Sequence, residues 1–339
     1  MQKDPFATRD STFDILKGIT ILLVIIGHCY IPKTYGHLIG SFHMPLFFLI
    51  SGYFSLKPIS KENLLRDFKR LLVPYFFFSS IICLVALFID ISHYSYSDGS
   101  YFQKKVIIHL LGYNHGPSLW KFYDYVDVIW FLPALFWAKA IASIIYNKVS
   151  NLNACIFAGV TVGCLGMILH HYIFAPFFFF QGTIAVPCVL IGILGKKYNV
   201  LETGIYKRFI PSLFFIWILC LQFPHAGGMW KAQFGDYYIL NTLGALGATL
   251  LLYHTTKTLS RKTFFWQVFE NLGKNSLVIL GVHAVEKTFT NWTALYYQLG
   301  APTHNFLLFQ LSTRVAIILL CAFILCKIKQ AYGASFALY

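Results

Sequence analysis

The first residues of the chain that can do chemistry are two histidines, which flank a short loop in otherwise apolar sequence. His28 and His43 both lie in GHCYIPKTYGHLIGSFHMPLFFLISGYF, which runs from Gly27 to Phe54. An imidazole is well suited to exchange a proton near neutral pH, and a polar side chain in an apolar segment usually serves a function. The pair predicts acid–base or nucleophilic chemistry. A polar helix–helix contact at His28 and an interfacial position at His43 are the alternatives.

Three basic residues follow in LLRDFKRLLVPYFFF. Arg66, Lys69 and Arg70 are spaced three and four residues apart, so one face of a helix can carry all three. Such a face suits phosphate groups, because guanidinium and ammonium groups form charge-assisted hydrogen bonds with them. The same residues are also explained by simple anchoring at the cytoplasmic surface of a membrane.

The elements that must position these groups are predominantly apolar. Of the 339 residues, 57% are hydrophobic and only 12% are charged, whereas soluble domains carry about 25% charged residues. The composition therefore predicts an all-α polytopic membrane protein. Ten stretches are long enough, or nearly so, to cross an apolar core of about 30 Å as helices, and the second and seventh are short. They are 13–31, 42–56, 73–91, 127–147, 153–173, 176–195, 209–224, 237–255, 275–296 and 306–328.

Basic residues set the expected orientation. With a cytoplasmic N-terminus, most of the 27 lysines and arginines fall at the inner ends of the ten stretches, as the positive-inside rule requires. Ten helices then leave both termini in the cytoplasm. The net charge of +14 indicates orientation and contact with anionic membrane lipids, and no nucleic-acid-binding motif accompanies it.

The chain predicts a single domain over residues 1–339, without an internal repeat. Its longest outer connection, about 92–126, contains FQKKVIIHLL, which predicts a short interfacial helix. A loop of this length is usually functional or disordered. A substrate platform and an ordinary surface loop are both compatible with it.

The first apolar stretch separates the histidine from the cytoplasmic charges. Lys17 lies at the inner end of this stretch and His28 follows eleven residues later, about 16 Å along a helix. His28 is therefore expected in the outer half of the bilayer.

An imidazole base needs a partner that fixes its tautomer. Asp127, at the outer start of the fourth stretch, and Glu286, one turn after His283, are the candidates. Asp127 also fits an interfacial role, and His283 fits a bridging polar contact. Glu286 and Arg314 are expected at similar depth on neighbouring stretches, where they would neutralise each other.

These motifs together resemble the acyltransferase 3 family of integral-membrane O-acyltransferases. The matching segments are FDILKGITILLVIIGH, FHMPLFFLISGYF and RLLVPYFFF, followed by VIWFLPALFW and LGKNSLVILGVHAVE. Lys17 and His28 match the family's spaced basic residue and histidine. Arg66 and Lys69 match its paired basic residues, with a lysine in place of a second arginine, and His283 resembles its late histidine.

The resemblance implies transfer of an acyl group, usually acetyl from acetyl-CoA, to a hydroxyl of a cell-surface or lipid-linked sugar. It implies a bacterial inner or plasma membrane and no metal. Lys17, Arg66, Lys69 and Arg70 would hold CoA, and His28 would act with His43 and Asp127 as general base or through an acyl-imidazole. Many relatives carry an extracytoplasmic hydrolase-like domain after the tenth helix, and this chain is expected to lack it.

Two other classes remain open. A polytopic transporter would use His28, His43, Glu286 and Arg314 for substrate or proton passage, although transporters often show the internal repeats that this sequence lacks. A different membrane acyltransferase fold would use a late His/Asn pair and lipid-modified protein acceptors. In that fold the informative motifs would lie in the second half of the chain.

Overall fold

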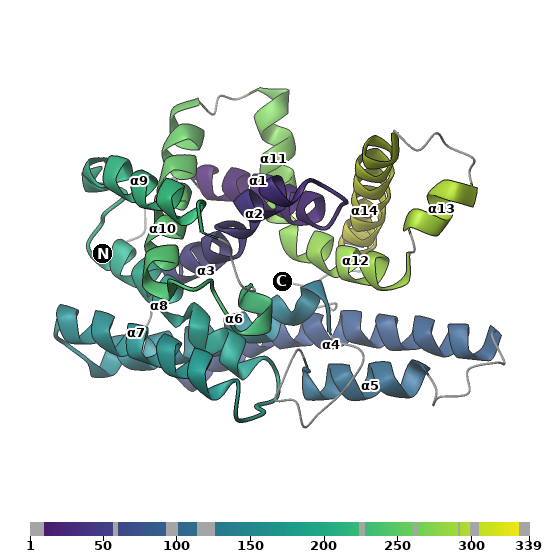
Figure 1. Ribbon diagram of the computed structural model, residues 1–339, viewed down its shortest axis with the longest axis horizontal. Helices are drawn as coiled ribbons and strands as arrows, with labels where there is room; N and C mark the ends of the chain where they lie inside the picture. Colours follow the sequence, from purple (N-terminus) through teal and green to yellow (C-terminus); the bar gives the residue numbers. More distant parts are fainter. Residues whose placement is uncertain are drawn as a thin grey trace.

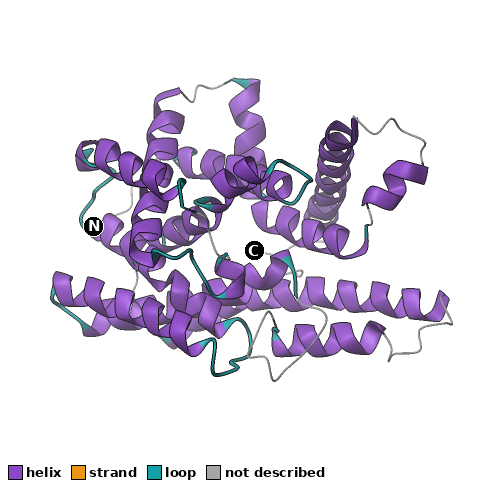
Figure 2. Cartoon of the chain, viewed as in Figure 1, coloured by secondary structure: helices purple, strands orange, loops and turns teal. Residues whose placement is uncertain are grey.

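The computed structural model describes residues 10–56, 60–92, 101–113, 126–223, 228–259, 263–290, 292–298 and 305–331. Within these ranges the chain forms helices and connecting turns and no strand, which confirms the all-α prediction (Figure 2). The α-helices are α1 (Thr12–Gly27), α2 (Lys33–Gly40), α3 (His43–Tyr53), α4 (Lys61–Ser92), α5 (Tyr101–Leu111), α6 (Phe131–Lys148), α7 (Leu152–Leu169), α8 (Phe179–Lys197), α9 (Ile210–Cys220), α10 (Tyr238–Leu259), α11 (Phe264–Lys274), α12 (Ser276–Phe289), α13 (Trp292–Gln298) and α14 (Phe306–Ala331). Three short 3₁₀ turns are η1 (Val128–Trp130), η2 (Ile205–Arg208) and η3 (Met229–Lys231).

Five helical segments in the described part of the chain are long and apolar enough to cross a membrane. They are Lys61–Ile91, Val128–Lys148, Leu152–Leu169, Phe179–Lys197 and Phe306–Leu325. Each of the ten stretches expected from the sequence contains a helix. Several of these helices are shorter than a full crossing, among them α3 and α9 with 11 residues each and α12 with 14.

Helix α8 is the most buried of the five segments and α7 and α14 are the most exposed. In Figure 1, α14 lies apart from α7 and α8, beside α12 and α13. In the most apolar 18-residue segment of α8, 78% is buried inside the protein, whereas only 22% of the corresponding segment is buried in α7 and in α14. Helix α8 packs on α3, α6 and α7, while α12 contacts α1, α4 and α14. The outward apolar faces of α7 and α14 are therefore the ones that lipid must cover.

Glycines bring α3 and α8 into backbone contact. A Cβ built on Gly52 would lie 2.0 Å from the carbonyl oxygen of Val189, and one built on Gly192 would lie 2.2 Å from that of Leu49. Small residues permit this close approach between helices in membranes. Pro45 is the third residue of α3, where a missing N–H costs nothing. The α3 motif therefore fixes the helix firmly against α8.

Helix α4 is longer than its sequence predicts. The third apolar stretch was expected to begin at residue 73, yet α4 runs without a break from Lys61 to Ser92 with Pro74 inside it. Membrane helices tolerate an internal proline because neighbouring groups satisfy the freed backbone carbonyl. One continuous element therefore joins the basic residues of its first turns to the apolar core.

Helix α5 forms where FQKKVIIHLL predicts a helix, but it lies along α4. Asp90 near the end of α4 accepts hydrogen bonds from the backbone N–H groups of Tyr101 and Phe102, and Tyr75 donates to the carbonyl of His109 at 2.7 Å. Helix α5 thus runs antiparallel to α4 (Figure 1). The rest of the outer connection, residues 93–100 and 114–125, lies outside the described residues.

Candidate active site

One cavity contains all three residues that the sequence nominates for catalysis. His28, His43 and Asp127 line a space of about 360 Å³, which falls in the range of about 300–1,000 Å³ typical of small-molecule sites. Its other walls come from the loop and helix between the two histidines and from η1, η3 and α12. The remaining lining residues are Val24, Gly27, Gly36, Ile39, Gly40, Met44, Val126, Val128, Trp130, Gly228, Met229, Trp230 and Lys287.

His28 caps the C-terminal end of α1. The helix ends at Gly27, and the N–H of His28 bonds to the carbonyl of Ile25 at 3.2 Å. The Nη1 of Arg314 donates to the carbonyl oxygen of His28 at 2.5 Å. Because the last carbonyls of a helix lack intrahelical donors, a cation there is favourable. Arg314 on α14 therefore fixes the backbone that carries the His28 ring.

His43 is the first residue of α3, and its ring orientation is fixed by the backbone. Its Nδ1 donates to the carbonyl oxygen of Ile39 at 2.7 Å, which leaves Nε2 as the acceptor of a neutral ring. The residues between the two histidines were expected to form a loop, but much of this segment is helix α2. Helix α2 supplies both the Ile39 carbonyl and part of the cavity wall.

Asp127 pairs with a lysine rather than with His28. Its carboxylate accepts two hydrogen bonds from Lys287 Nζ, at 2.5 and 2.7 Å, and the two side chains are 23% and 22% exposed. The expectation that Asp127 fixes the tautomer of His28 is therefore not what the structure shows, since a stronger cationic partner occupies its oxygens. Asp127 and Lys287 instead form one charged wall of the cavity.

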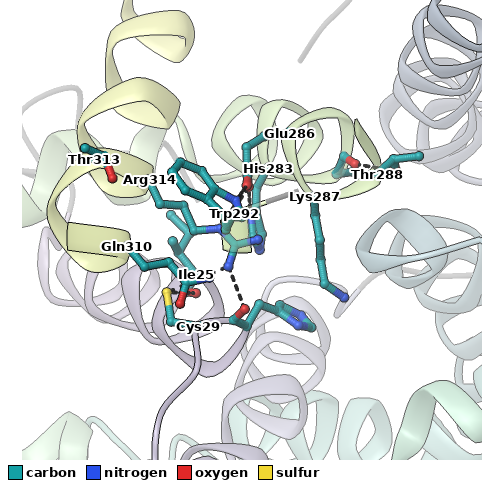
Figure 3. Close-up of polar contacts among 12 residues, drawn as sticks. Ile25, Cys29, His283, Glu286, Lys287, Thr288, Trp292, Gln310, Thr313 and Arg314 are labelled. Atoms are coloured by element: carbon teal, nitrogen blue, oxygen red, sulfur yellow. Dashed lines mark hydrogen bonds and ion pairs between the residues drawn. The ribbon is translucent and has the colours of Figure 1, made fainter. Parts of the chain in front are cut away.

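Figure 3 shows a buried polar network around Glu286, which includes His283, Trp292 and Arg314. It lies next to His28, because the ring centres of His28 and His283 are 5.3 Å apart. Glu286 accepts hydrogen bonds from Arg314 Nε at 2.9 and 3.1 Å, from His283 Nδ1 at 2.9 Å and from the indole of Trp292. The predicted neutralisation of Glu286 by Arg314 is thus confirmed. A buried charge is tolerated when it is paired and hydrogen-bonded in this way. Neither residue lines the cavity.

Sequence reasoning missed the aromatic part of the cavity wall. Trp230 belongs to η3, and its backbone carbonyl accepts a hydrogen bond from Gln181 of α8 at 3.3 Å. Trp130 ends η1 and belongs to the same wall. No spacing in the sequence connects residue 230 with residue 28, because only tertiary packing brings η3 beside α1. Lys287, which directly follows Glu286 on α12, was likewise not expected at this site.

The basic residues of α4 line a separate, shallow cavity of about 70 Å³. Arg66 and Arg70 line it together with Lys139 of α6, and Lys139 is bound to Asp67 at 2.7 Å. Lys69 is exposed and does not line this space. Of the three basic residues predicted to act together, Arg66 and Arg70 therefore share a cavity and Lys69 does not. Lys139 was not expected at this cavity.

Lys17, the remaining residue nominated for CoA binding, pairs with Asp14 one turn earlier on α1. Its Nζ lies 2.7 Å from the carboxylate of Asp14. Among the described residues, no group of three or more His, Cys, Asp or Glu side chains is arranged to hold a metal ion.

The fold and the cavity define a membrane-embedded helical protein with two histidines that line one cavity. The chain matches the acyltransferase domain that defines the acyltransferase 3 family over residues 10–326. It belongs to this family. No solved structure matches the chain.

Two curated relatives share a shorter segment. Over 89 residues the chain is 36% identical to Nodulation protein NolL of Sinorhizobium fredii and 37% identical to Nodulation protein NolL of Mesorhizobium japonicum. Each alignment covers 22% of this chain and 24% of the relative. The chain thus spans about a quarter of the length of the curated relatives it matches.

Proposed function

We propose that this protein is a membrane O-acyltransferase that moves an acetyl group from cytoplasmic acetyl-CoA to a hydroxyl of a cell-surface or lipid-linked sugar. The convergence of His28, His43 and Asp127 on one cavity carries the proposal. His28 and His43 flank one short segment, and Asp127 joins them from a distant part of the chain. Membership of the acyltransferase 3 family supports the same chemistry.

His28 is the general base of the proposed reaction. It takes the proton of the acceptor hydroxyl while the oxygen attacks the thioester carbonyl carbon. The C–S bond then breaks, and the CoA thiolate receives the proton back from His28. In the covalent variant the imidazole attacks the thioester first, and the sugar hydroxyl attacks the resulting acyl-imidazole. His43, with Nε2 as its available nitrogen, and the Asp127–Lys287 pair orient the acceptor.

The donor enters from the side of the first turns of α4. Arg66 and Arg70, with Lys139 beside them, offer the charge-assisted donors that the phosphates of CoA require. Lys69 and Lys17 contribute from outside this shallow cavity. The pantetheine arm then extends along the helices toward His28. Holding both reactants in place supplies much of the rate enhancement.

The proposal includes a bacterial inner or plasma membrane and a single domain of ten crossings with both termini in the cytoplasm. The distribution of basic residues supports this orientation. Both curated relatives come from bacteria. The lipid-facing surfaces of α7 and α14 fit contact with membrane lipids.

Release of free CoA tests the proposal directly. Purified protein in detergent is incubated with acetyl-CoA and a carbohydrate extract of the membranes that contain it, and the thiol is titrated. We expect acetyl-CoA-dependent CoA release together with acetyl esters on the sugar, detected by mass spectrometry. A protein that moves sugars or protons in vesicles but releases no CoA from acetyl-CoA would instead be a transporter. The absence of Glu286 and Arg314 from the cavity wall argues against that alternative.

A further inference from the structure

His283 is a fully buried histidine in which only one of the two ring nitrogens, Nδ1, has a hydrogen-bond partner among the described residues. Its side chain is 0% exposed, and Nδ1 lies 2.9 Å from the carboxylate of Glu286. Among the described residues, Nε2 has no hydrogen-bond partner. A buried polar atom without a partner costs free energy, so its persistence needs a reason.

The contacts of Glu286 determine the tautomer of His283. The carboxylate already accepts hydrogen bonds from Arg314 and Trp292, which only donate, so it is ionised and accepts from His283 as well. Nδ1 of His283 therefore carries the proton. In the neutral ring, Nε2 then holds a lone pair and can only accept.

The imidazole ring of His283, which carries this Nε2, lies against the ring of His28. The ring centres of His28 and His283 are 5.3 Å apart, with an angle of 47° between the planes. Imidazoles that share an N–H···N hydrogen bond have ring centres at about this spacing, because each nitrogen lies close to the centre of its ring. No hydrogen bond joins the two rings in this conformation. Forming one requires the His28 ring to turn toward His283.

We propose that the Glu286–His283 pair is a positioning device for His28, in which Nε2 of His283 accepts the ring N–H of His28 during the reaction. This bond fixes the tautomer of His28 and leaves its other nitrogen, on the side of the cavity, as the proton acceptor. The inference rests on the proposed function, since it assigns a role relative to the general base. It assigns no contact with substrate to either His283 or Glu286.

The surroundings of the pair suit this role. Arg314 connects Glu286 with His28, because its Nε donates a hydrogen bond to the Glu286 carboxylate and its Nη1 donates one to the carbonyl of His28. Besides His283, the charged and titratable groups that face His28 are Lys287, His43 and Arg314. The described residues offer the His28 ring nitrogens no carboxylate of their own, since Asp127 is bound to Lys287. His283 is thus the neighbour through which the charge of Glu286 reaches His28.

Two substitutions of His283 distinguish a role in positioning His28 from a role in folding of the protein. His283→Phe keeps a ring but removes both nitrogens, and His283→Gln keeps an amide oxygen that can accept near the position of Nε2. We expect His283→Phe to lower kcat by about tenfold to a hundredfold, since a reacting group misplaced by about 1 Å can cost about 10² in rate. The KM for acetyl-CoA should stay unchanged. His283→Gln should recover part of kcat.

The matched control is His170→Phe, which replaces another buried histidine at the end of α7 that contacts Phe180. We expect wild-type kcat there, with all variants compared after size-exclusion chromatography and thermal unfolding. A well-folded His283→Phe with wild-type kcat overturns the inference, as does a His283→Gln no better than His283→Phe. If the wild type itself releases no CoA, the proposed function fails. If His28→Ala is inactive while His283→Phe is fully active, only the positioning role fails.

Discussion

The two histidines of the cavity differ in what holds their rings. His43 donates from Nδ1 to a backbone carbonyl, so its tautomer is set by the end of helix α2. His28 has its backbone fixed by Arg314, while its ring faces another imidazole. His43 is therefore preset and His28 can rotate.

Replacing each histidine by alanine distinguishes their roles. We expect His28→Ala to lower acyl transfer by about 10²–10⁴-fold, the usual cost of losing a general base, with acetyl-CoA binding nearly intact. His43→Ala should be slowed less, because it orients the acceptor. Steady-state CoA release and a separate CoA-binding measurement check both expectations. An inactive His43→Ala beside a His28→Ala that keeps more than about a tenth of wild-type turnover would reverse the assignment.

The Asp127–Lys287 pair makes a prediction of its own. Since its two side chains are 23% and 22% exposed, the ion pair contributes about 0–1 kcal/mol to stability. Asp127→Asn should therefore leave thermal unfolding nearly unchanged and raise the KM for the sugar more than it lowers kcat. The charge-swapped double variant Asp127→Lys/Lys287→Asp restores the pair in the opposite direction. A loss of kcat in Asp127→Asn as large as that in His28→Ala would mean that Asp127 acts on the base directly.

At the scale of the elements, the sequence predicts the positions of the helices better than their lengths or contacts. Apolar composition alone marks the ten stretches, because lipid requires apolar side chains on its helices. The Glu286–Arg314 pair follows from the cost of a lone buried charge. Helix α2, the path of α4 through Pro74 and the place of Trp230 depend on contacts between distant segments. Their positions therefore emerge only in the folded chain.

Helix α4 also carries a test of donor binding. We expect Arg66→Ala and Arg70→Ala each to weaken CoA binding by about tenfold to a hundredfold, because a hydrogen bond to a charged group contributes about 1.5–3 kcal/mol. Lys69→Ala is the matched control from the same helix turn and should cost less, since Lys69 does not line the cavity. Binding is measured by calorimetry at low and physiological salt. Equal effects at all three positions would indicate a diffuse basic surface instead of a defined site.

For the molecule as a whole, orientation is the property on which the donor and acceptor sides depend. On a background without the native cysteines, single cysteines placed in 60–70, 196–208 or 263–274 should resist a membrane-impermeant thiol reagent added outside intact cells. Cysteines at positions 33–35, in the exposed segment after the first apolar stretch, provide the outward-facing comparison and should react. The positive-inside distribution of charge is the physical reason. External labelling within 60–70 would show that the orientation is the reverse of the expected one. The proposed CoA site would then lie outside the cytoplasm.

Helix α14 combines a lipid-exposed surface with a hydrogen bond to the backbone of His28, the proposed general base. Only 22% of its most apolar 18-residue segment is buried inside the protein. Its Arg314 nevertheless donates a hydrogen bond to the backbone carbonyl of His28. A bilayer thicker or thinner than the apolar length of a helix changes the tilt of that helix. A change in the tilt of α14 should therefore displace the end of α1, where His28 lies. Turnover in this protein should accordingly depend on the acyl-chain length of the surrounding phospholipids, so that the bilayer itself tunes the enzyme.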